Sequence, residues 1–178
     1  VQTMHDVAAE QPRRRWLLHL AAVQACLVVA VLTLHQPSHA AWQTLDDRVR
    51  IFRLPGIYGP GRSALDKVRD GSAHRIDLPG QVFSRIHVTD ICRAVEASFD
   101  APPGLYNIGD DRPASHNAVT EHASRLLGIE PPPLQTMDEA GLSPMARGFY
   151  AENRRVANGK AKRVLGWKPL YPDYKAGL

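Results

Sequence analysis

The chain has 178 residues, of which 44% are hydrophobic and 22% are charged. This length and composition are typical of a globular protein with one sizeable core, and they exclude a largely disordered chain. The formal net charge is +4, from 22 basic and 18 acidic residues that are spread along the sequence. Because no stripe of lysine and arginine alternates with aromatic residues, we expect no nucleic-acid partner.

The two cysteines, Cys26 and Cys92, lie in apolar stretches and are not spaced as a CxxC pair. The sequence therefore predicts neither a disulfide framework nor a zinc site, and no metal site is expected. We expect both side chains to be buried thiols.

A long apolar run distinguishes the first 47 residues from the rest of the chain. Residues 16–34 form a 19-residue run without a formal charge, which is about the length needed to cross a bilayer. Three arginines precede the run and small residues follow it, as in a signal peptide, although His19 and Gln24 interrupt it. A buried core helix is also compatible, because the run is apolar on all sides.

A further interpretation is that residues 1–47 are out-of-frame sequence, since everything from residue 48 onward resembles an internal piece of a cytosolic enzyme. We therefore divide the chain into an atypical segment, 1–47, and an α/β domain, 48–178. A cytoplasmic location is expected for the domain. The alternative is a protein that associates with a membrane through residues 16–34.

From residue 48 onward, strand patterns alternate with helix patterns, which is typical of an α/β domain. Alternating or short apolar runs predict strands over residues 48–54, 81–88 and 105–109. Polar caps and glycine stops predict helices over residues 63–70, 89–99, 115–128 and 158–165. Thr89 is the expected cap of the second helix. The expected buried face of the third consists of Val119, Ala123, Leu126 and Leu127.

Residues 55–62 (PGIYGPGR) are predicted to form a glycine-rich turn after the first strand. Glycines allow the backbone to turn sharply and to approach a ligand closely, and Arg62 offers several donors to an anionic group. An ordinary turn that ends a strand is the other interpretation of the same residues.

Four motifs occur in an order that is found in one known family. They are RLPGIYGPG at 53–61, RIHVTD at 85–90, YNIG at 106–109 and KRVLGWKP at 162–169. Together they resemble the extended short-chain dehydrogenase/reductases, which include the sugar-nucleotide epimerases and dehydratases. The resemblance covers residues 48–178, and the stretch 142–156 is most similar to bacterial proteins described only as NAD-dependent epimerase/dehydratase homologues.

The resemblance implies the C-terminal half of a Rossmann-type fold, with the dinucleotide half missing and NAD or NADP as the cofactor. It implies an NAD(P)-dependent epimerase/dehydratase-like oxidoreductase, in truncated form, with a sugar-nucleotide-type substrate, and it leaves room for a homodimer. The residues that it places beside the nicotinamide are Pro55, Gly56, Ile57 and Tyr58. Those that it places near the substrate cleft are Arg62, Arg85 and His87.

The residues themselves leave the role of the 85–90 motif open. Guanidinium groups such as that of Arg85 bind phosphate oxygens in a bidentate way, which suits a diphosphate. His87 is equally compatible with a satisfied histidine at a strand end, and Asp90 with a first-turn residue that complements the helix dipole. Asn107 is likewise compatible with a purely structural role in a turn.

Two elements of catalysis in the family have no counterpart in the expected positions. No G-x-x-G-x-x-G turn is present, and residues 1–52 contain no tyrosine for the Y-x-x-x-K pair that precedes the 53–61 motif. We interpret the match from Tyr171 to Lys175 as coincidence, because a proline follows the tyrosine. No catalytic residue is therefore predicted. The alternative function is a non-catalytic domain that binds a nucleotide-sugar or a protein.

Overall fold

The structure is a computed structural model that describes residues 48–151, 153 and 155–178. The interpretations of the apolar run at 16–34, of the whole segment 1–47 and of Cys26 lie outside these residues. Within the described part, no helix is both long enough and apolar enough to cross a membrane.

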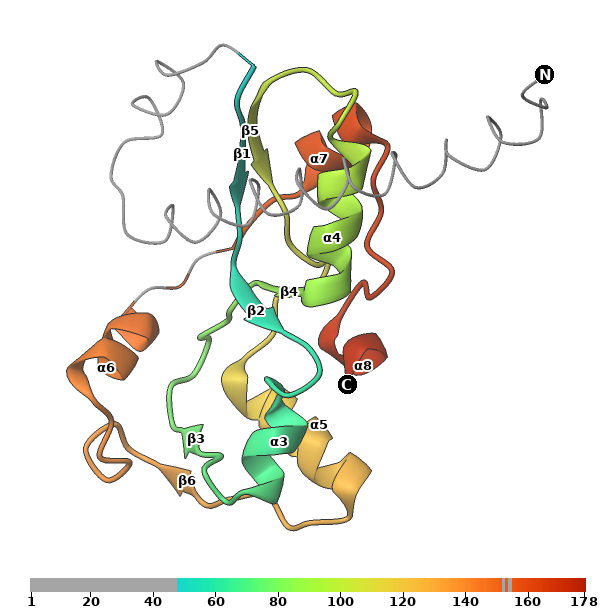
Figure 1. Ribbon diagram of the computed structural model, residues 1–178. Helices are drawn as coiled ribbons and strands as arrows, with labels where there is room; N and C mark the ends of the chain where they lie inside the picture. The colour runs from blue at the N-terminus through green and yellow to red at the C-terminus, as the bar shows by residue number, and fades with distance from the viewer. Residues whose placement is uncertain (1–47, 152, 154) are drawn as a thin grey trace, which may run out of the picture.

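The described chain forms an α/β fold in which every strand pair is parallel (Figure 1). In the first pair, Ile51 lies opposite Leu105, and in the second, Ile57 lies opposite Ile86. The three pairs are β1 (Arg50–Arg53) with β5 (Gly104–Asn107), β2 (Gly56–Tyr58) with β4 (Arg85–His87), and β3 (Arg75–Ile76) with β6 (Leu134–Gln135). The alternation of strands and helices in the sequence predicted this fold class correctly.

The chain changes its strand partner at Leu54–Pro55, between β1 and β2. The carbonyl of Arg53 still accepts a hydrogen bond from the N–H of Ile108 at 3.0 Å, and Gly56 donates to the carbonyl of Ser84 at 3.2 Å. Pro55 has no N–H to continue the first ladder. The prediction of a turn over 55–62 is therefore wrong for residues 56–58, which are a strand, and the turn comes after them, at 59–62.

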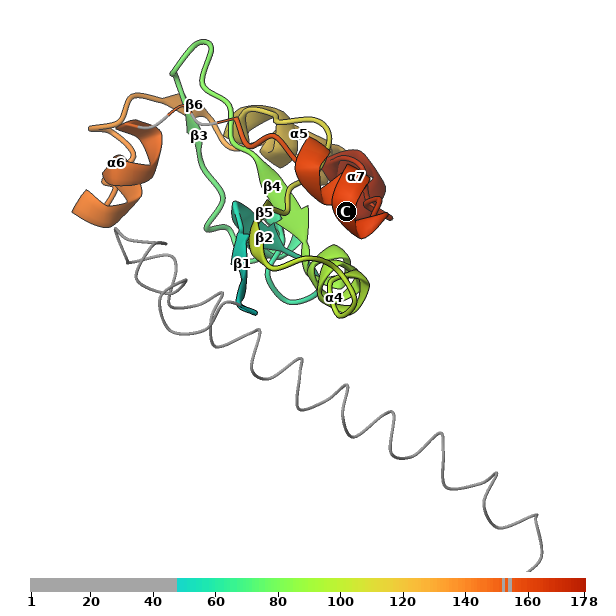
Figure 2. The ribbon, with the colours of Figure 1, turned by 90° about the horizontal axis from the view of Figure 1, so that it is seen from above.

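Helices lie in two groups around these strands (Figures 1 and 2). α4 (Val88–Ala97) and α7 (Gly159–Leu165) pack together beside β5, and α3 (Ala64–Arg69) packs against α5 (His116–Leu127). α6 (Pro144–Ala151) lies apart from both groups, and the short α8 (Tyr174–Gly177) contacts α5. The main core lies between β1, β4, β5, α4 and α7 and includes Phe52, Ile86, Val95, Tyr106, Ile108, Leu165 and Trp167.

The helix ends follow the caps expected from the sequence in three of four cases. Ser63 and Asp66 form a capping box at α3, and Ser115 accepts a hydrogen bond from the N–H of Ala118 at the start of α5. Gly128 and Gly166 adopt the left-handed conformation that ends α5 and α7. The structure therefore confirms the predicted helices near residues 63–70, 115–128 and 158–165.

The fourth cap differs from the prediction. The Nδ1 atom of His87 accepts a hydrogen bond from the N–H of Thr89, so His87 and not Thr89 is the N-cap of α4. This helix ends at Ala97 and does not reach Phe99, because Ser98 turns its hydroxyl back to the carbonyl of Val95. The predicted strand over 81–88 is likewise shorter, and only Arg85–His87 belong to β4.

Two predictions of burial are wrong. Cys92 is exposed, because α4 turns Ala94 and Val95 toward the core and position 92 away from it. Leu126 is 54% exposed, whereas Thr120 and Ser124 are buried, because contacts with α3, β3 and α8 set the rotation of α5. The two-residue strands β3 and β6 were not predicted, and segments this short have no recognisable period.

Candidate functional site

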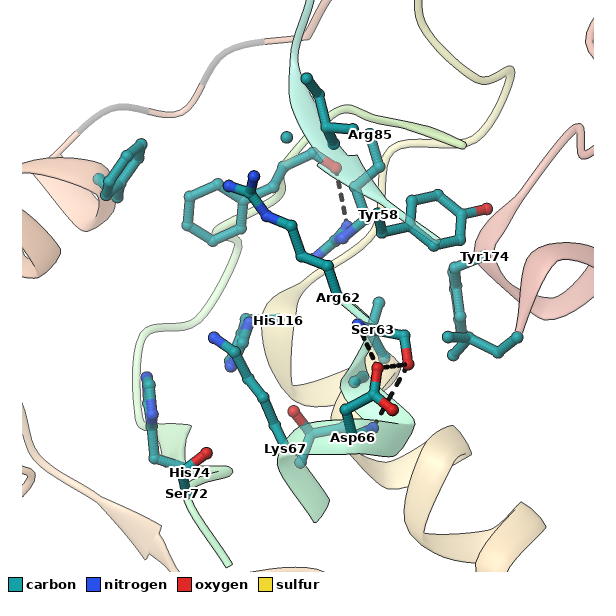
Figure 3. Close-up of a pocket in the computed structure, with 18 of the residues that line it drawn as sticks. Tyr58, Arg62, Ser63, Asp66, Lys67, Ser72, His74, Arg85, His116 and Tyr174 are labelled. Atoms are coloured by element: carbon teal, nitrogen blue, oxygen red, sulfur yellow. Dashed lines mark hydrogen bonds between the residues drawn. The ribbon is translucent and has the colours of Figure 1, made fainter. Parts of the chain in front are cut away.

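A pocket of about 620 Å³ opens between β2, α3, α5, α6 and the C-terminal residues (Figure 3). Of the residues predicted to bind cofactor or substrate, Gly56, Ile57, Tyr58, Arg62 and Arg85 line this pocket. The two that do not line it are Pro55 and His87. The sheet brings the predicted residues together because β2 and β4 are parallel partners, so the 53–61 and 85–90 motifs lie side by side.

Two cationic side chains stand at one side of the pocket. Arg62 is the last residue of the turn at 59–62, and Lys67 lies on α3 one turn after its cap. Both are exposed, and within the described part of the chain neither side chain has a hydrogen bond or ion pair. The nearby Asp66 is occupied by the capping box, whose hydrogen bonds from Ser63 hold the pKa of the carboxyl below its ordinary value. These two cations are therefore available to an anionic ligand.

Arg85 braces the wall of the pocket as well as lining it. Its guanidinium donates to the carbonyl of Phe83 at 3.0 Å and to that of Ala114 at 2.7 Å, which fixes the loop before α5. Burial lowers the pKa of Arg85, and the charge of Asp110 acts in the opposite direction. The phosphate-binding role predicted for Arg85 thus competes with a structural one, because part of its hydrogen-bonding capacity is used inside the fold.

His87 lies behind the pocket and is only 5% exposed. Besides capping α4, its ring contacts the rings of Tyr58 and Tyr171, with centroids 5.2 and 4.1 Å away. Burial lowers the pKa of His87, so the ring is neutral at pH 7. In this structure His87 supports the wall that Tyr58 forms, which is the structural interpretation that the sequence left open.

An imidazole–phenol cluster next to Lys67 also lines the pocket. It consists of His74 before β3, His116 at the start of α5 and Tyr150 on α6. The rings of His74 and His116 are stacked with centroids 5.0 Å apart, and the Nε2 atom of His74 is 3.0 Å from the Tyr150 hydroxyl. Sequence reasoning missed both histidines, because 42 positions separate them and only the fold makes them neighbours.

The electrostatic environment keeps this cluster uncharged at neutral pH. Burial lowers the pKa of His116 to about 4, and the positive charges of Arg85 and Lys67 act in the same direction. Burial also raises the pKa of Tyr150 to about 12. The pocket therefore has a cationic side and a neutral, polar–aromatic side.

The C-terminal segment completes the pocket through Tyr174 and Leu178. Tyr58 donates a hydrogen bond from its hydroxyl to the carbonyl of Asp173 at 3.3 Å, and burial raises the pKa of this phenol. Tyr171 lies before α8, which begins at Tyr174, so Tyr171 and Lys175 are not presented by one helix.

Comparison with known proteins gives relatives that extend over most of this chain. No family model matches. A 3-diazoavenalumate denitrifying reductase from Streptomyces is 32% identical over 143 residues, which are 72% of this chain and 45% of that protein. Protein YeeZ of Escherichia coli K12 is 29% identical over 70% of the chain and 42% of its own length. The chain thus spans less than half the length of the curated relatives that it matches.

Solved structures show the same fold. A functionally unknown conserved protein from Silicibacter pomeroyi is 47% identical, with a TM-score of 0.71, over 76% of this chain and 49% of that one. UDP-glucose 4-epimerase of Thermus thermophilus, in complex with NAD, has a TM-score of 0.59 at 17% identity, over 77% and 47%. A human epimerase family protein with NADPH has a TM-score of 0.60 at 18% identity, over 73% and 46%.

The matches to the two nucleotide-bound proteins have low identities and establish the fold alone. The fold is also the one that the four motifs implied. In the structure the motif at 53–61 runs from the end of β1 through β2, and the motif at 85–90 covers β4 and the start of α4. The motif at 106–109 begins on β5, and the motif at 162–169 begins on α7. In its motifs the chain resembles the extended short-chain dehydrogenase/reductases of the NAD-dependent epimerase/dehydratase type, and it has the C-terminal part of their fold.

Proposed function

We propose that this chain forms the substrate-binding part of an NAD(P)-dependent epimerase/dehydratase-like oxidoreductase that acts on a sugar-nucleotide-type substrate. The observation that carries the proposal is the pocket beside β2, which is lined by the cations Arg62 and Lys67 and by a neutral wall of His74, His116 and Tyr150. A diphosphate would pair with the cations, because guanidinium and ammonium groups bind phosphate oxygens strongly. A polyhydroxylated ring suits the neutral wall, which offers hydrogen-bonding groups without charge.

The described residues supply only part of a dinucleotide site. The resemblance assigns the β2 backbone to the nicotinamide, but Gly56 already donates to Ser84, and the β2 residues pair with β4. The N-terminus of α3 is occupied by its own capping box. Within the described part, no strand is followed by the G-x-x-G-x-x-G turn that would hold the pyrophosphate. We therefore assign NAD or NADP to the protein by family and assign no catalytic step to it here.

The test is calorimetric titration of the full chain with UDP-glucose, UDP and NAD. We expect UDP-glucose and UDP to bind and the Arg62→Ala and Lys67→Ala variants each to weaken both ligands about tenfold, because each loses one charge-assisted contact. Arg163→Ala on α7 is the matched control, since this arginine is exposed and does not line the pocket. Failure of both nucleotides to bind wild-type protein would contradict the proposal.

A second candidate function is a non-catalytic domain that recognises a nucleotide-sugar. The observation that favours it is that, in the described residues, the literal Y-x-x-x-K match is split by the start of α8. Binding of UDP-glucose without any conversion of the nucleotide-sugar in the presence of NAD or NADP would favour this candidate over the oxidoreductase. The homodimer and the cytoplasmic location stay predictions, which sedimentation and cell fractionation would test.

A further inference from the structure

One face of α6 borders the pocket with an exposed aromatic ring. Ala146, Phe149 and Tyr150 line the pocket, and residues three and four positions apart lie on the same side of a helix. Phe149 is 65% exposed, and among the exposed large apolar side chains of the described part it is the only one that lines the pocket. An exposed aromatic ring at the wall of a cavity is typical of a ligand-binding surface, because a bound ligand removes its apolar area from water.

The neighbouring rings of the pocket already have partners. The ring of Phe83 meets that of Tyr150 edge-on, with centroids 5.5 Å apart, and the guanidinium carbon of Arg85 lies 5.9 Å from the centroid of Phe83. The Tyr150 hydroxyl is 3.0 Å from Nε2 of His74, which ties α6 to the segment before β3. Phe149 has no ring or cation contact with any described residue. Its ring is therefore available to a ligand, next to a Tyr150 ring that the fold holds in place.

The charged residues of the same pocket indicate what else the ligand carries. Arg62 and Lys67 are exposed and, in the described part of the chain, have no ion pair, so they can bind an anionic group. The two carboxylates that line the pocket, those of Asp66 and Asp70, accept hydrogen bonds from nearby backbone N–H groups. A ligand that suits both the ring and the cations has a flat aromatic group and a separate anionic group.

We propose that Phe149 stacks on a planar aromatic ring of the ligand, whose anionic group is bound by Arg62 and Lys67. Contact between two aromatic rings contributes affinity beyond the apolar area that it buries. A nucleobase with its diphosphate and an aromatic carboxylate share this chemistry. The inference deepens the proposed function and rests on its assignment of the pocket as the substrate site. Phe149 is a specificity-determining binding residue, and no step of the reaction is assigned to it.

The test titrates the full chain with UDP, with cinnamate and with glucose 1-phosphate. UDP and cinnamate each carry an aromatic ring and an anionic group, whereas glucose 1-phosphate carries an anionic group and no aromatic ring. On binding to wild-type protein, the ring-proton resonances of the aromatic probe should move upfield, as protons above an aromatic ring do. In calorimetry, Phe149→Ala should weaken the aromatic probe about tenfold, because the ring contact is lost, and should leave glucose 1-phosphate unchanged.

Two further variants control for changes in α6 itself. Phe149→Trp keeps an aromatic ring and should keep an affinity close to that of wild type. Met145→Ala is the matched control, since Met145 is 75% exposed on the same helix and does not line the pocket. Equal weakening of the aromatic probe by Met145→Ala and Phe149→Ala would overturn the inference, because the effect would then come from the helix and not from the ring.

The outcomes separate this inference from the proposed function. If UDP binds without a ring-proton shift and equally well to Phe149→Ala and wild type, the inference is overturned and the proposed function stands. Equal weakening of glucose 1-phosphate by Phe149→Ala also overturns the inference. If cinnamate binds with both effects whereas UDP and UDP-glucose do not bind, the inference stands with an aromatic acid as the ligand, and the proposed function fails. If UDP, UDP-glucose and cinnamate all fail to bind, both are overturned.

Discussion

The carboxylate of Asp90, which is completely buried, accepts a hydrogen bond from the backbone N–H of Tyr171 at 2.9 Å, across 81 positions of sequence. The same carboxylate accepts from the N–H of Leu170 at 2.6 Å, and the indole of Trp167 donates to the Asp90 carbonyl at 3.1 Å. These bonds hold the C-terminal segment against α4. They thereby position Tyr174 and Leu178, which complete the pocket.

Asp90→Ala should destabilise the protein by about 2–4 kcal/mol, because two backbone N–H groups lose a charged acceptor at once. Urea unfolding of the full chain measures this change. Asp100→Ala is the control, since Asp100 is exposed, and its free energy of unfolding should stay within about 0.5 kcal/mol of wild type. Equal effects of the two substitutions would show that the Asp90 contacts do not hold the C-terminal segment.

Asp110 should make stability fall as the pH rises. This carboxyl is 3% exposed, its Oδ1 atom has no partner in the described part, and burial raises its pKa to about 7 although Arg85 acts against this. Between the ordinary value of 3.8 and about 7, the folded state keeps a proton that the unfolded state has released. Rising pH therefore favours unfolding over this interval.

The matching measurement compares Asp110→Asn with wild type by urea unfolding at pH 4.5 and pH 8. The asparagine variant should gain stability relative to wild type at pH 8 and much less at pH 4.5, because its amide does not titrate. His116 should act in the opposite direction, since its pKa of about 4 lies below the ordinary 6.5 and folding then excludes a proton as the pH falls. If the difference in unfolding free energy between Asp110→Asn and wild type were the same at both pH values, the raised pKa of Asp110 would be contradicted.

Gly177 should not tolerate a side chain, because α8 lies directly on the Tyr58 ring. A Cβ atom at this position would lie 2.2 Å from the Tyr58 hydroxyl oxygen and 2.8 Å from two ring atoms. Gly177→Ala should therefore cost about 1–3 kcal/mol in unfolding free energy, as expected for overpacking. Gly148→Ala on α6 meets no atom within 4 Å and should be neutral or stabilising. If Gly177→Ala and Gly148→Ala had equal unfolding free energies, the close packing of α8 on Tyr58 would be contradicted.

Cys92 should react rapidly with a thiol reagent in the folded protein, because it is exposed on the outer side of α4. In a Cys26→Ser variant, which leaves Cys92 as the single thiol, the rate in native buffer should approach the rate in denaturant. A Cys26→Ser/Cys92→Ser variant gives the background. If the reaction were many-fold slower in native buffer than in denaturant, Cys92 would lie in the core, as the sequence had suggested.

The sequence by itself determined those features that depend on neighbouring residues. Ser63, Ser115, Gly128 and Gly166 mark helix ends because a cap acts within one turn of the backbone, and the four motifs indicated the fold. The same local information located Arg62 in the turn before α3 and Arg85 on the strand β4. It misjudged Cys92 and Leu126, since periodicity alone does not fix the rotation of a helix against its neighbours.

Only the tertiary structure decided which distant residues meet. The two strand partners of residues 50–58, the anchoring of the C-terminal segment by Asp90, and the stacking of His74 on His116 all join positions that are far apart in the sequence. Such contacts follow from packing the whole chain into one core, and no local pattern encodes them. Arg62 and Arg85 could thus be anticipated as pocket residues, whereas Lys67 and the imidazole wall join them only once the chain is folded.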